Sequence, residues 1–194
     1  MWTAAILAGG QGTRLGGIDK SRLAVGNVTI LQRQLDMLRA LTSHLLIVTS
    51  QGRSCREAGV RVVEDRVPGA GALGGLYTAL VEADTERVLV IACDMPFVSD
   101  TLVARLVDRA ARAEAVVPRD GSGRHPLCAC YQRVVAPRLR ARLDAGALRV
   151  QDALDDLAVD EVGPAELAAL DPGGLQLLNV NTPGGLARAR ASAR

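Results

Sequence analysis

Short runs of aliphatic residues alternate along this chain with segments whose apolar residues recur at helical spacing. Continuous apolar runs are typical of strands buried on both faces, and parallel strands need helical crossovers between them. The alternation therefore predicts an α/β fold with a mostly parallel central sheet and helices on both faces. A chain of 194 residues is the size of one domain. No linker interrupts it, so we expect a single domain over residues 1–194.

The positions of the elements follow from periodicity and from cap and turn residues. The expected strands cover residues 2–7, 44–50, 60–64, 87–93, 115–118, 127–131 and 177–180. The expected helices cover residues 30–41, 73–83, 100–112, 134–145 and 149–157, with a last helix that starts at Pro183. Thr29 and Asp100 stand where they would cap helices, and Pro164 and residues 172–174 are interpreted as turns.

Composition argues against several classes of partner. Aromatic residues make up 2% of the chain, which leaves few platforms on which single-stranded nucleic acid could stack. The net charge is +2 and the arginines are dispersed, so we expect no nucleic-acid partner. No apolar run approaches the length of a membrane span, and no basic leader opens the chain. These features predict a cytoplasmic protein without membrane association.

The four cysteines and two histidines do not form a metal-binding pattern. None of the cysteines belongs to a Cys-x-x-Cys pair, which is the usual spacing of structural zinc ligands. We therefore interpret them as small buried side chains that stay reduced. They are Cys55, Cys93, Cys128 and Cys130.

The loop after the first strand combines glycines with positive charge. Five glycines between residues 9 and 17 let the backbone approach a ligand and turn its amides toward an anion. Arg14 and Lys20 add two cations, and Lys20 is the one lysine among 23 basic residues. Its compact ammonium differs from the planar fork of arginine. The spacing fits neither a P-loop nor a dinucleotide fingerprint. A phosphate chain is the expected guest, and a connector without a ligand is the alternative.

Polar side chains follow three other expected strands. Asp94 comes directly after an apolar strand, where a carboxylate together with phosphate oxygens is a usual magnesium site. Asp65 precedes a glycine-rich run, and Asn179 and Asn181 alternate onto one face of the late strand. Ligands of open parallel sheets bind at the carboxyl ends of the strands, so these side chains mark a candidate site. Each also has a plainer explanation as a cap or turn residue.

In combination, these motifs resemble a known family. Residues 7–20 are similar to the signature loop of the nucleotidyltransferases that build activated sugars and cofactors. The double glycine followed by Asp-Lys most resembles that of the molybdenum cofactor guanylyltransferases. Further matching segments occur in the family's order, at residues 72–75, 92–96, 125–127 with Tyr131, and 179–183. The resemblance covers nearly the whole chain and implies a Rossmann-like nucleotidyltransferase fold.

This resemblance implies transfer of GMP from GTP to the phosphate of molybdopterin, which forms the guanine dinucleotide cofactor and releases pyrophosphate. It implies Mg²⁺ as cofactor, bound by Asp94, and catalytic roles for Lys20, Arg14 and Asp94. The implied nucleotide site comprises Leu7, Ala8, Gly9, Gly10, Lys20, Gln51, Asp65 and Asp94. The implied pterin side comprises Arg14, Gly17, Gly75, Arg149, Asn179 and Asn181. Proteins that deliver or accept the cofactor are further candidate partners.

The chain departs from the family's pattern after the second strand. Ser50-Gln51-Gly52 stands where the family has an asparagine that contacts the base. Gln51 is able to read guanine, but the choice of guanine over cytosine rests on the resemblance alone. Two alternatives therefore stay open. One is a related nucleotidyltransferase that uses CTP or another phosphorylated acceptor, and the other is a non-catalytic nucleotide-binding protein.

Overall fold

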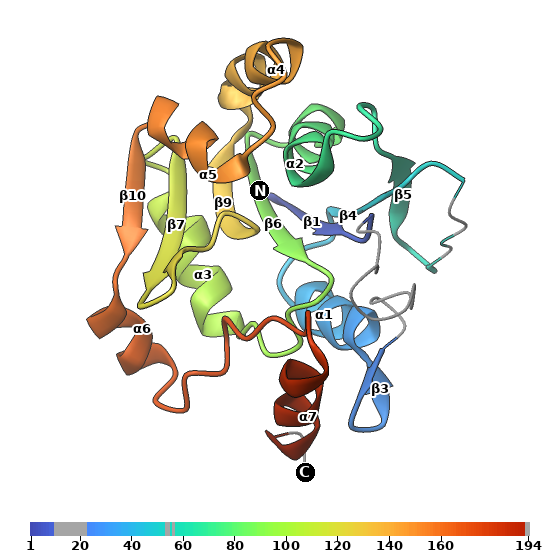
Figure 1. The fold of residues 1–194 in the computed structure, drawn as a ribbon, viewed down its shortest axis with the longest axis vertical. Coiled ribbons are helices and arrows are strands. Elements are labelled where there is room, and N and C mark those ends of the chain that lie inside the picture. Colours follow the sequence, from blue (N-terminus) through green and yellow to red (C-terminus); the bar gives the residue numbers. More distant parts are fainter. Residues whose placement is uncertain (10–22, 53–54, 56, 193–194) are drawn as a thin grey trace.

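The computed structural model describes residues 1–9, 23–52, 55 and 57–192 (Figure 1). Its main sheet has the strand order β10-β7-β9-β6-β1-β4-β5, with β8 paired to β7 outside this path. The strands of this sheet are β1 (Thr3–Leu7), β4 (Leu45–Thr49), β5 (Arg61–Glu64), β6 (Arg87–Ala92), β7 (Ala115–Asp120), β8 (Gly123–Arg124), β9 (Cys128–Gln132) and β10 (Val159–Val162). A separate antiparallel hairpin is formed by β2 (Ala24–Val25) and β3 (Val28–Thr29).

Most neighbouring strands of the main sheet run parallel. β5, β4, β1 and β6 pair in parallel, and β10 pairs in parallel with β7. β9 is antiparallel to both of its neighbours, β6 and β7. This arrangement confirms the prediction of an α/β fold with a mostly parallel sheet. Because parallel strands end at one edge, the carboxyl ends of β1, β4, β5 and β6 lie side by side.

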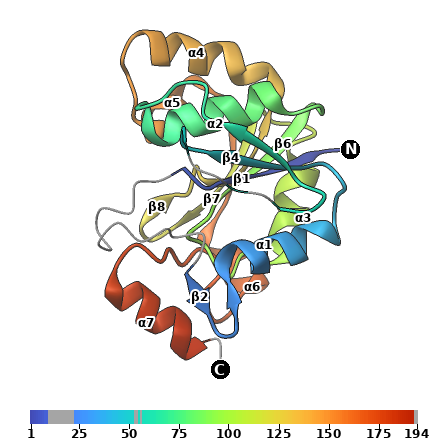
Figure 2. The same ribbon diagram turned by 90° about the vertical axis from the view of Figure 1, so that its right-hand side faces the viewer.

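Helices cover both faces of the sheet (Figure 2). One face carries α1 (Ile30–Arg39), α3 (Asp100–Arg109) and α6 (Pro164–Leu170). The other face carries α2 (Gly71–Glu82), α4 (Ala136–Asp144) and α5 (Val150–Ala153). Short 3₁₀ helices at Arg133–Val135 and Leu154–Asp156 adjoin α4 and α5. The last helix, α7 (Pro183–Ser192), packs beside β2.

The two apolar layers follow from the two-residue period of a strand. In β1, Ala4 and Ile6 pack into the layer that holds α1 and α3, while Ala5 and Leu7 pack into the layer that holds α2. The buried positions of α1 and α3 recur at helical spacing along one side of each helix, which fits them to the flat sheet surface. Aliphatic side chains dominate both layers, as the low aromatic content requires.

The predicted helices and most of the predicted strands are confirmed. Thr29 caps α1 as expected, because its hydroxyl accepts a 3.1 Å hydrogen bond from the backbone N–H of Gln32. The predicted cap at Asp100 is wrong. Ser99 accepts the bond from the N–H of Leu102 at 3.2 Å, and Asp100 is the first residue of α3. Its negative charge still favours that helix end.

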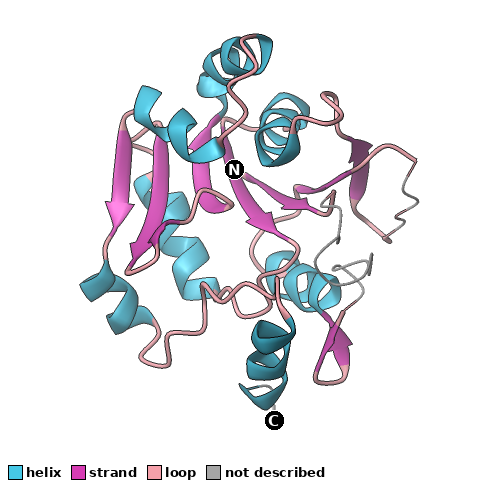
Figure 3. Cartoon of the chain, viewed as in Figure 1, coloured by secondary structure: helices cyan, strands magenta, loops and turns pink. Residues whose placement is uncertain are grey.

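The strand predicted at residues 177–180 is wrong, since this segment is a loop that leads into α7 (Figure 3). Its apolar residues suggested a buried strand, but they serve a different core. Leu178 and Val180 pack into a third cluster with Val25 and Ile30, away from the main sheet. The N–H of Val180 also bonds the carbonyl of Asp94 instead of a neighbouring strand.

The sequence pattern did not indicate β10 or α6. β10 reads Val-Asp-Glu-Val and lies at the edge of the sheet, where its carboxylates pair with arginines. Asp160 bonds Arg109, and Glu161 bonds Arg124 at 2.7 Å, which holds the pKa of the Glu161 carboxyl below its usual value. Pro164, interpreted as a turn, instead opens α6 at the first helical position, where proline is favoured.

Candidate functional site

A cleft of about 640 Å³ opens at the carboxyl edge of the sheet, beside the ends of β1, β4, β5 and β6. Its volume falls in the range of about 300 to 1,000 Å³ that is common for small-molecule sites. The described residues that line it are Leu7, Gly9, Val48, Thr49, Ser50, Gln51, Asp65, Pro68, Gly69, Gly71, Ala72, Gly75, Ala92, Cys93, Asp94 and Leu127.

Several of the residues predicted from the sequence meet in this cleft. Those that line it are Leu7, Gly9, Gln51, Asp65, Gly75 and Asp94. Ala8 lies buried behind them, and its N–H bonds the carbonyl of Val48 at 2.8 Å. Gly10, Arg14, Gly17 and Lys20 lie outside the described residues, so their roles stay predictions.

Gly9 and Ser50 join the ends of β1 and β4 at the floor of the cleft. The hydroxyl of Ser50 donates a hydrogen bond to the carbonyl of Gly9. A Cβ atom at position 9 would lie 3.1 Å from the backbone nitrogen of Ser50 and 3.2 Å from its hydroxyl oxygen. Only glycine lets the two loops approach this closely without a shift. The glycine-rich loop therefore begins at a point fixed against β4.

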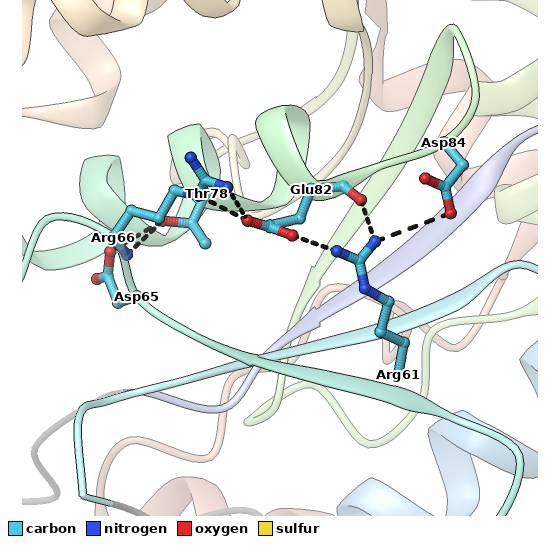
Figure 4. Close-up of polar contacts among 6 residues, drawn as sticks. All are labelled: Arg61, Asp65, Arg66, Thr78, Glu82 and Asp84. Atoms are coloured by element: carbon cyan, nitrogen blue, oxygen red, sulfur yellow. Dashed lines mark hydrogen bonds and ion pairs between the residues drawn. The ribbon is translucent and has the colours of Figure 1, made fainter.

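Asp65 is held at the rim of the cleft by α2 and by its own loop (Figure 4). Its Oδ1 atom accepts hydrogen bonds from the N–H of Val67 at 2.9 Å and from the hydroxyl of Thr78 at 3.0 Å. That hydroxyl in turn accepts a 3.0 Å bond from the N–H of Arg66. One carboxylate oxygen of Asp65 is therefore hydrogen-bonded to its own loop and to α2, while the residue still lines the cleft.

The ion pairs behind Asp65 brace α2 against β5 (Figure 4). Glu82, the last residue of α2, accepts a 2.6 Å hydrogen bond from the guanidinium of Arg66 and also forms an ion pair with Arg61. Arg61 further approaches Asp84 at 3.8 Å. These arginines are therefore engaged with carboxylates on α2 and beyond it, which fixes the strand and helix that carry Asp65 and Thr78.

Asp94 stands at the end of β6 in a turn that is fixed by backbone hydrogen bonds. The N–H of Cys93 bonds the carbonyl of Leu7 at 3.1 Å, and the N–H of Met95 bonds that of Ala92 at 3.3 Å. The carbonyl of Asp94 accepts a 2.8 Å bond from the N–H of Val180. Its carboxylate is half-buried and belongs to the lining of the cleft.

One of the two carboxylates of the cleft fits a magnesium ion that is shared with a ligand. Asp65 and Asp94 follow β5 and β6, and two other strands separate these in the sheet. Three strand spacings correspond to about 14 Å, so the two residues are badly placed to share one ion. No cluster of three histidine, cysteine or acidic side chains occurs within the described ranges. One carboxylate combined with phosphate oxygens and water suits Mg²⁺, and Asp94 is positioned for that role.

The predicted residues on the pterin side are only partly brought to the cleft. Gly75 lines it, and a Cβ there would lie 3.4 Å from the side chain of Leu7. Asn179 and Asn181 are not part of the lining, but Val180 between them bonds Asp94. Their predicted alternation on a strand face is wrong because the segment is a loop.

Arg149 lies away from the lining, with a side chain that is 81% exposed. It precedes α5, and its guanidinium lies 3.8 Å from the carboxylate of Asp152. The side chain of Gln151 bonds the carbonyl of Arg124 at 2.8 Å, which ties the start of α5 to β8. The structure does not bring Arg149 to the cleft, and its role stays a prediction.

The buried thiols next to the sheet are poor candidates for chemistry. Burial raises the pKa of both Cys128 and Cys130 to about 12, so both stay protonated near neutral pH. Tyr131 is also fully buried, and its hydroxyl donates a 2.7 Å bond to the carbonyl of Pro126. That bond fixes the short loop that brings Leu127 to the cleft.

Comparison with known proteins agrees with this geometry. A family profile described as "MobA-like NTP transferase domain" matches residues 4–158. A protein from Pelotomaculum thermopropionicum, named "probable molybdenum cofactor guanylyltransferase", is 32% identical over 98% of this chain and 93% of its own length. This chain belongs to the MobA-like NTP transferase family.

Two solved structures show how widely the family's fold is shared. Molybdopterin-guanine dinucleotide biosynthesis protein A from Archaeoglobus fulgidus has a TM-score of 0.83 and 24% identity, covering 99% of this chain and 98% of its own. A 2-C-methyl-D-erythritol 4-phosphate cytidylyltransferase from Thermus thermophilus has a TM-score of 0.75 and 22% identity, with full coverage of both chains. Both likenesses confirm the Rossmann-like nucleotidyltransferase fold.

In this family member, two residues that the sequence pattern did not indicate support the site. Thr78 stands in an apolar helix and is fully buried, and it holds Asp65. Ser50 holds Gly9. A polar residue among apolar helix positions was the available signal for Thr78.

Within the described ranges, no helix has both the length and the apolar character needed to cross a membrane.

Proposed function

We propose that this protein transfers GMP from GTP to the phosphate of molybdopterin, which yields the guanine dinucleotide cofactor and pyrophosphate. The observation that carries the proposal is that Gly9, where the glycine-rich loop begins, and Asp94 line the same cleft. The first residue of a loop suited to phosphates and a carboxylate suited to Mg²⁺ thus lie at one edge of the sheet. The 32% identity to a relative named for this activity supports the choice of substrates.

The residues of the cleft suit transfer of a phosphoryl-type group. Such a reaction depends on positioning and on neutralising charge more than on a covalent nucleophile. We assign charge neutralisation to Lys20 and Arg14, and close backbone contact with the nucleotide to Gly9. The attacking phosphate of molybdopterin is already anionic, so no general base is required. It fits this view that the described part of the lining contains no histidine.

We assign magnesium binding to Asp94, with the other ligands coming from triphosphate oxygens and water. When bound, Mg²⁺ supplies charge neutralisation and orientation of the triphosphate. The backbone of the turn at Asp94 is anchored by bonds to Leu7 and Val180, and Asp94 lines the cleft. Asp65, three strand spacings away, is assigned to the nucleoside.

The acceptor side of the proposed reaction lies toward the C-terminal segment. Asn179 and Asn181 flank Val180, which bonds Asp94, so an acceptor phosphate near them would also be near the metal-binding carboxylate. Gly75 lines the same cleft. The roles of Arg149 and Gly17, and any delivery or acceptor proteins, rest on the family resemblance.

Calorimetric titration with GTP, CTP and ATP in the presence of Mg²⁺ tests the nucleotide. We expect GTP to bind most tightly. Ser50 and Gln51 line the cleft in place of the family's asparagine, which makes CTP the informative competitor. Tighter binding of CTP than of GTP would contradict the proposal and favour the cytidylyl alternative.

A further inference from the structure

Gln34 is a buried polar residue on a helix that otherwise packs apolar side chains against the sheet. It is 2% exposed, and its buried neighbours on α1 are Ile30, Leu31, Leu35 and Leu38. A carboxamide in such a layer loses its contacts with water, so its hydrogen bonds must compensate. The buried carboxamide of Gln34 therefore needs hydrogen-bond partners within the fold.

The carboxamide of Gln34 spans the two ends of the turn that carries Asp94. Its Nε2 atom donates to the carbonyl of Ala92 at 2.9 Å and to the carbonyl of Met95 at 3.0 Å. Its Oε1 atom is buried and accepts no hydrogen bond from any of the residues that the structure describes. The opposite orientation of the amide would set Oε1 against two carbonyl oxygens, so the bonds themselves fix the orientation.

These two bonds reinforce a turn in which one of the backbone hydrogen bonds is long. The bond from the N–H of Met95 to the carbonyl of Ala92 measures 3.3 Å, which is long for this type. Gln34 bonds the same two residues from α1, and Val180 bonds Asp94 between them. The turn is thus held by a helix and by the C-terminal segment.

We infer that Gln34 is a positioning residue, whose two donated hydrogen bonds hold the turn so that the Asp94 carboxylate meets the metal–nucleotide complex. The inference rests on the proposed function, because it assigns Gln34 to the metal site of that reaction. Groups that orient metal ligands typically change metal affinity by about 10- to 100-fold when they are removed. Packing alone would not have this effect, because a side chain of the same shape without donors would then serve equally well.

The test compares Gln34→Met with Gln32→Met. Both variants make the same chemical change on α1, but the amide of Gln32 is directed to Asp36 on the surface and does not reach the turn. Mn²⁺ serves as the probe, because free Mn²⁺ has a sharp electron paramagnetic resonance spectrum that weakens on binding. Titrations with GTP present, and again with CTP, measure metal affinity without turnover. Thermal unfolding of each variant is recorded in parallel.

We expect Gln34→Met to unfold cooperatively and to bind Mn²⁺ at least about 10-fold more weakly in the nucleotide complex, while Gln32→Met matches the parent protein. The Mg²⁺ concentration for half-maximal rate should rise in the same proportion. Equal Mn²⁺ affinity in Gln34→Met and the parent would overturn the inference.

A second variant covers the case in which Gln34→Met does not fold. Gln34→Leu also removes both donors and matches the leucines beside it on α1, and we expect the same loss of Mn²⁺ affinity. If neither variant folds, the carboxamide supports the whole fold rather than the turn, which also overturns the inference. A parent protein that binds no metal–nucleotide complex would instead refute the proposed function itself, and with it this role of Gln34.

Discussion

The backbone N–H of Val180 donates a 2.8 Å hydrogen bond to the carbonyl oxygen of Asp94. This bond joins the segment before α7 to the carboxyl end of β6, far away in the sequence. The family profile ends at residue 158, so it covers Asp94 but not Val180. The candidate site therefore depends on a C-terminal segment that lies outside the matched domain.

Replacing the Asp94 carboxylate should abolish turnover and leave the fold intact. In Asp94→Asn we expect the rate of GMP transfer to fall at least about 100-fold, because charge stabilisation at the phosphates depends on the bound ion. The bond to Val180 uses the backbone carbonyl, so it survives the change. The melting temperature should shift by less than about 4 °C. Kinetics at several Mg²⁺ concentrations and a thermal melt provide the check, and normal activity would show that the metal ligand is misassigned.

Two adjacent buried glycines of α2 should respond in opposite ways to alanine. A Cβ at Gly74 would lie 2.9 Å from the carbonyl oxygen of Val67 and 3.1 Å from a carboxylate oxygen of Asp65. Such overpacking costs about 1 to 3 kcal/mol, which exceeds the gain of about 1 kcal/mol from replacing glycine in a helix. Gly74→Ala should therefore lower the free energy of unfolding by about 1 kcal/mol.

Gly75→Ala is the matched control. Its Cβ would make an ordinary contact with Leu7 at 3.4 Å, so the helical gain of up to about 1 kcal/mol should prevail. The added methyl group narrows the cleft, and the KM for molybdopterin should rise. Denaturant melts and steady-state kinetics on both variants separate the two effects. Equal destabilisation by both changes would contradict the packing assigned to Gly74.

The hydroxyl of Thr78 should matter more than its methyl group. Thr78→Val leaves the N–H of Arg66 without its partner and removes one of the two hydrogen bonds that Oδ1 of Asp65 accepts, at a cost of about 1 to 3 kcal/mol. It should also weaken GTP binding, because Asp65 loses a support. Thr78→Ser keeps the hydroxyl and should retain nucleotide affinity. Calorimetry on the pair checks this, and equal GTP affinity in all three proteins would mean that Thr78 does not act through Asp65.

Lys20→Arg should behave as a disruptive change although it keeps the charge. A planar guanidinium differs in shape and donor geometry from a compact ammonium, so we expect kcat/KM to fall at least about tenfold. Arg14→Lys provides the reciprocal comparison at the other cation of the loop. Near-normal kinetics for Lys20→Arg would remove the argument that the chain's one lysine has a specific role.

Much of the fold was accessible from the sequence because the apolar strands and amphipathic helices have strong periods. Thr29, with β-branched and apolar residues after it, marked the start of α1 correctly. β10 was not predicted because an edge strand with Asp160 and Glu161 has no continuous apolar run. The segment before α7 was misleading for the opposite reason, since Leu178 and Val180 are apolar but serve a separate cluster.

The site was predicted where it depends on strand ends, and missed where it depends on tertiary contacts. Asp65 and Asp94 follow directly after strands, so topology alone brought them to the cleft. Thr78, Ser50 and Gln34 act through partners distant in sequence, and no local pattern links them to those partners. Only the three-dimensional packing of α1 and α2 against the sheet, and of β1 beside β4, reveals their contacts.

The most direct test of the account is a product assay with the purified protein, Mg²⁺ and molybdopterin. Mass spectrometry identifies the dinucleotide, and a coupled assay measures pyrophosphate. With GTP we predict equal amounts of the guanine dinucleotide and pyrophosphate, and no pyrophosphate when molybdopterin is omitted. Faster product formation with CTP than with GTP, or pyrophosphate release without molybdopterin, would contradict the assignment of a molybdopterin guanylyltransferase.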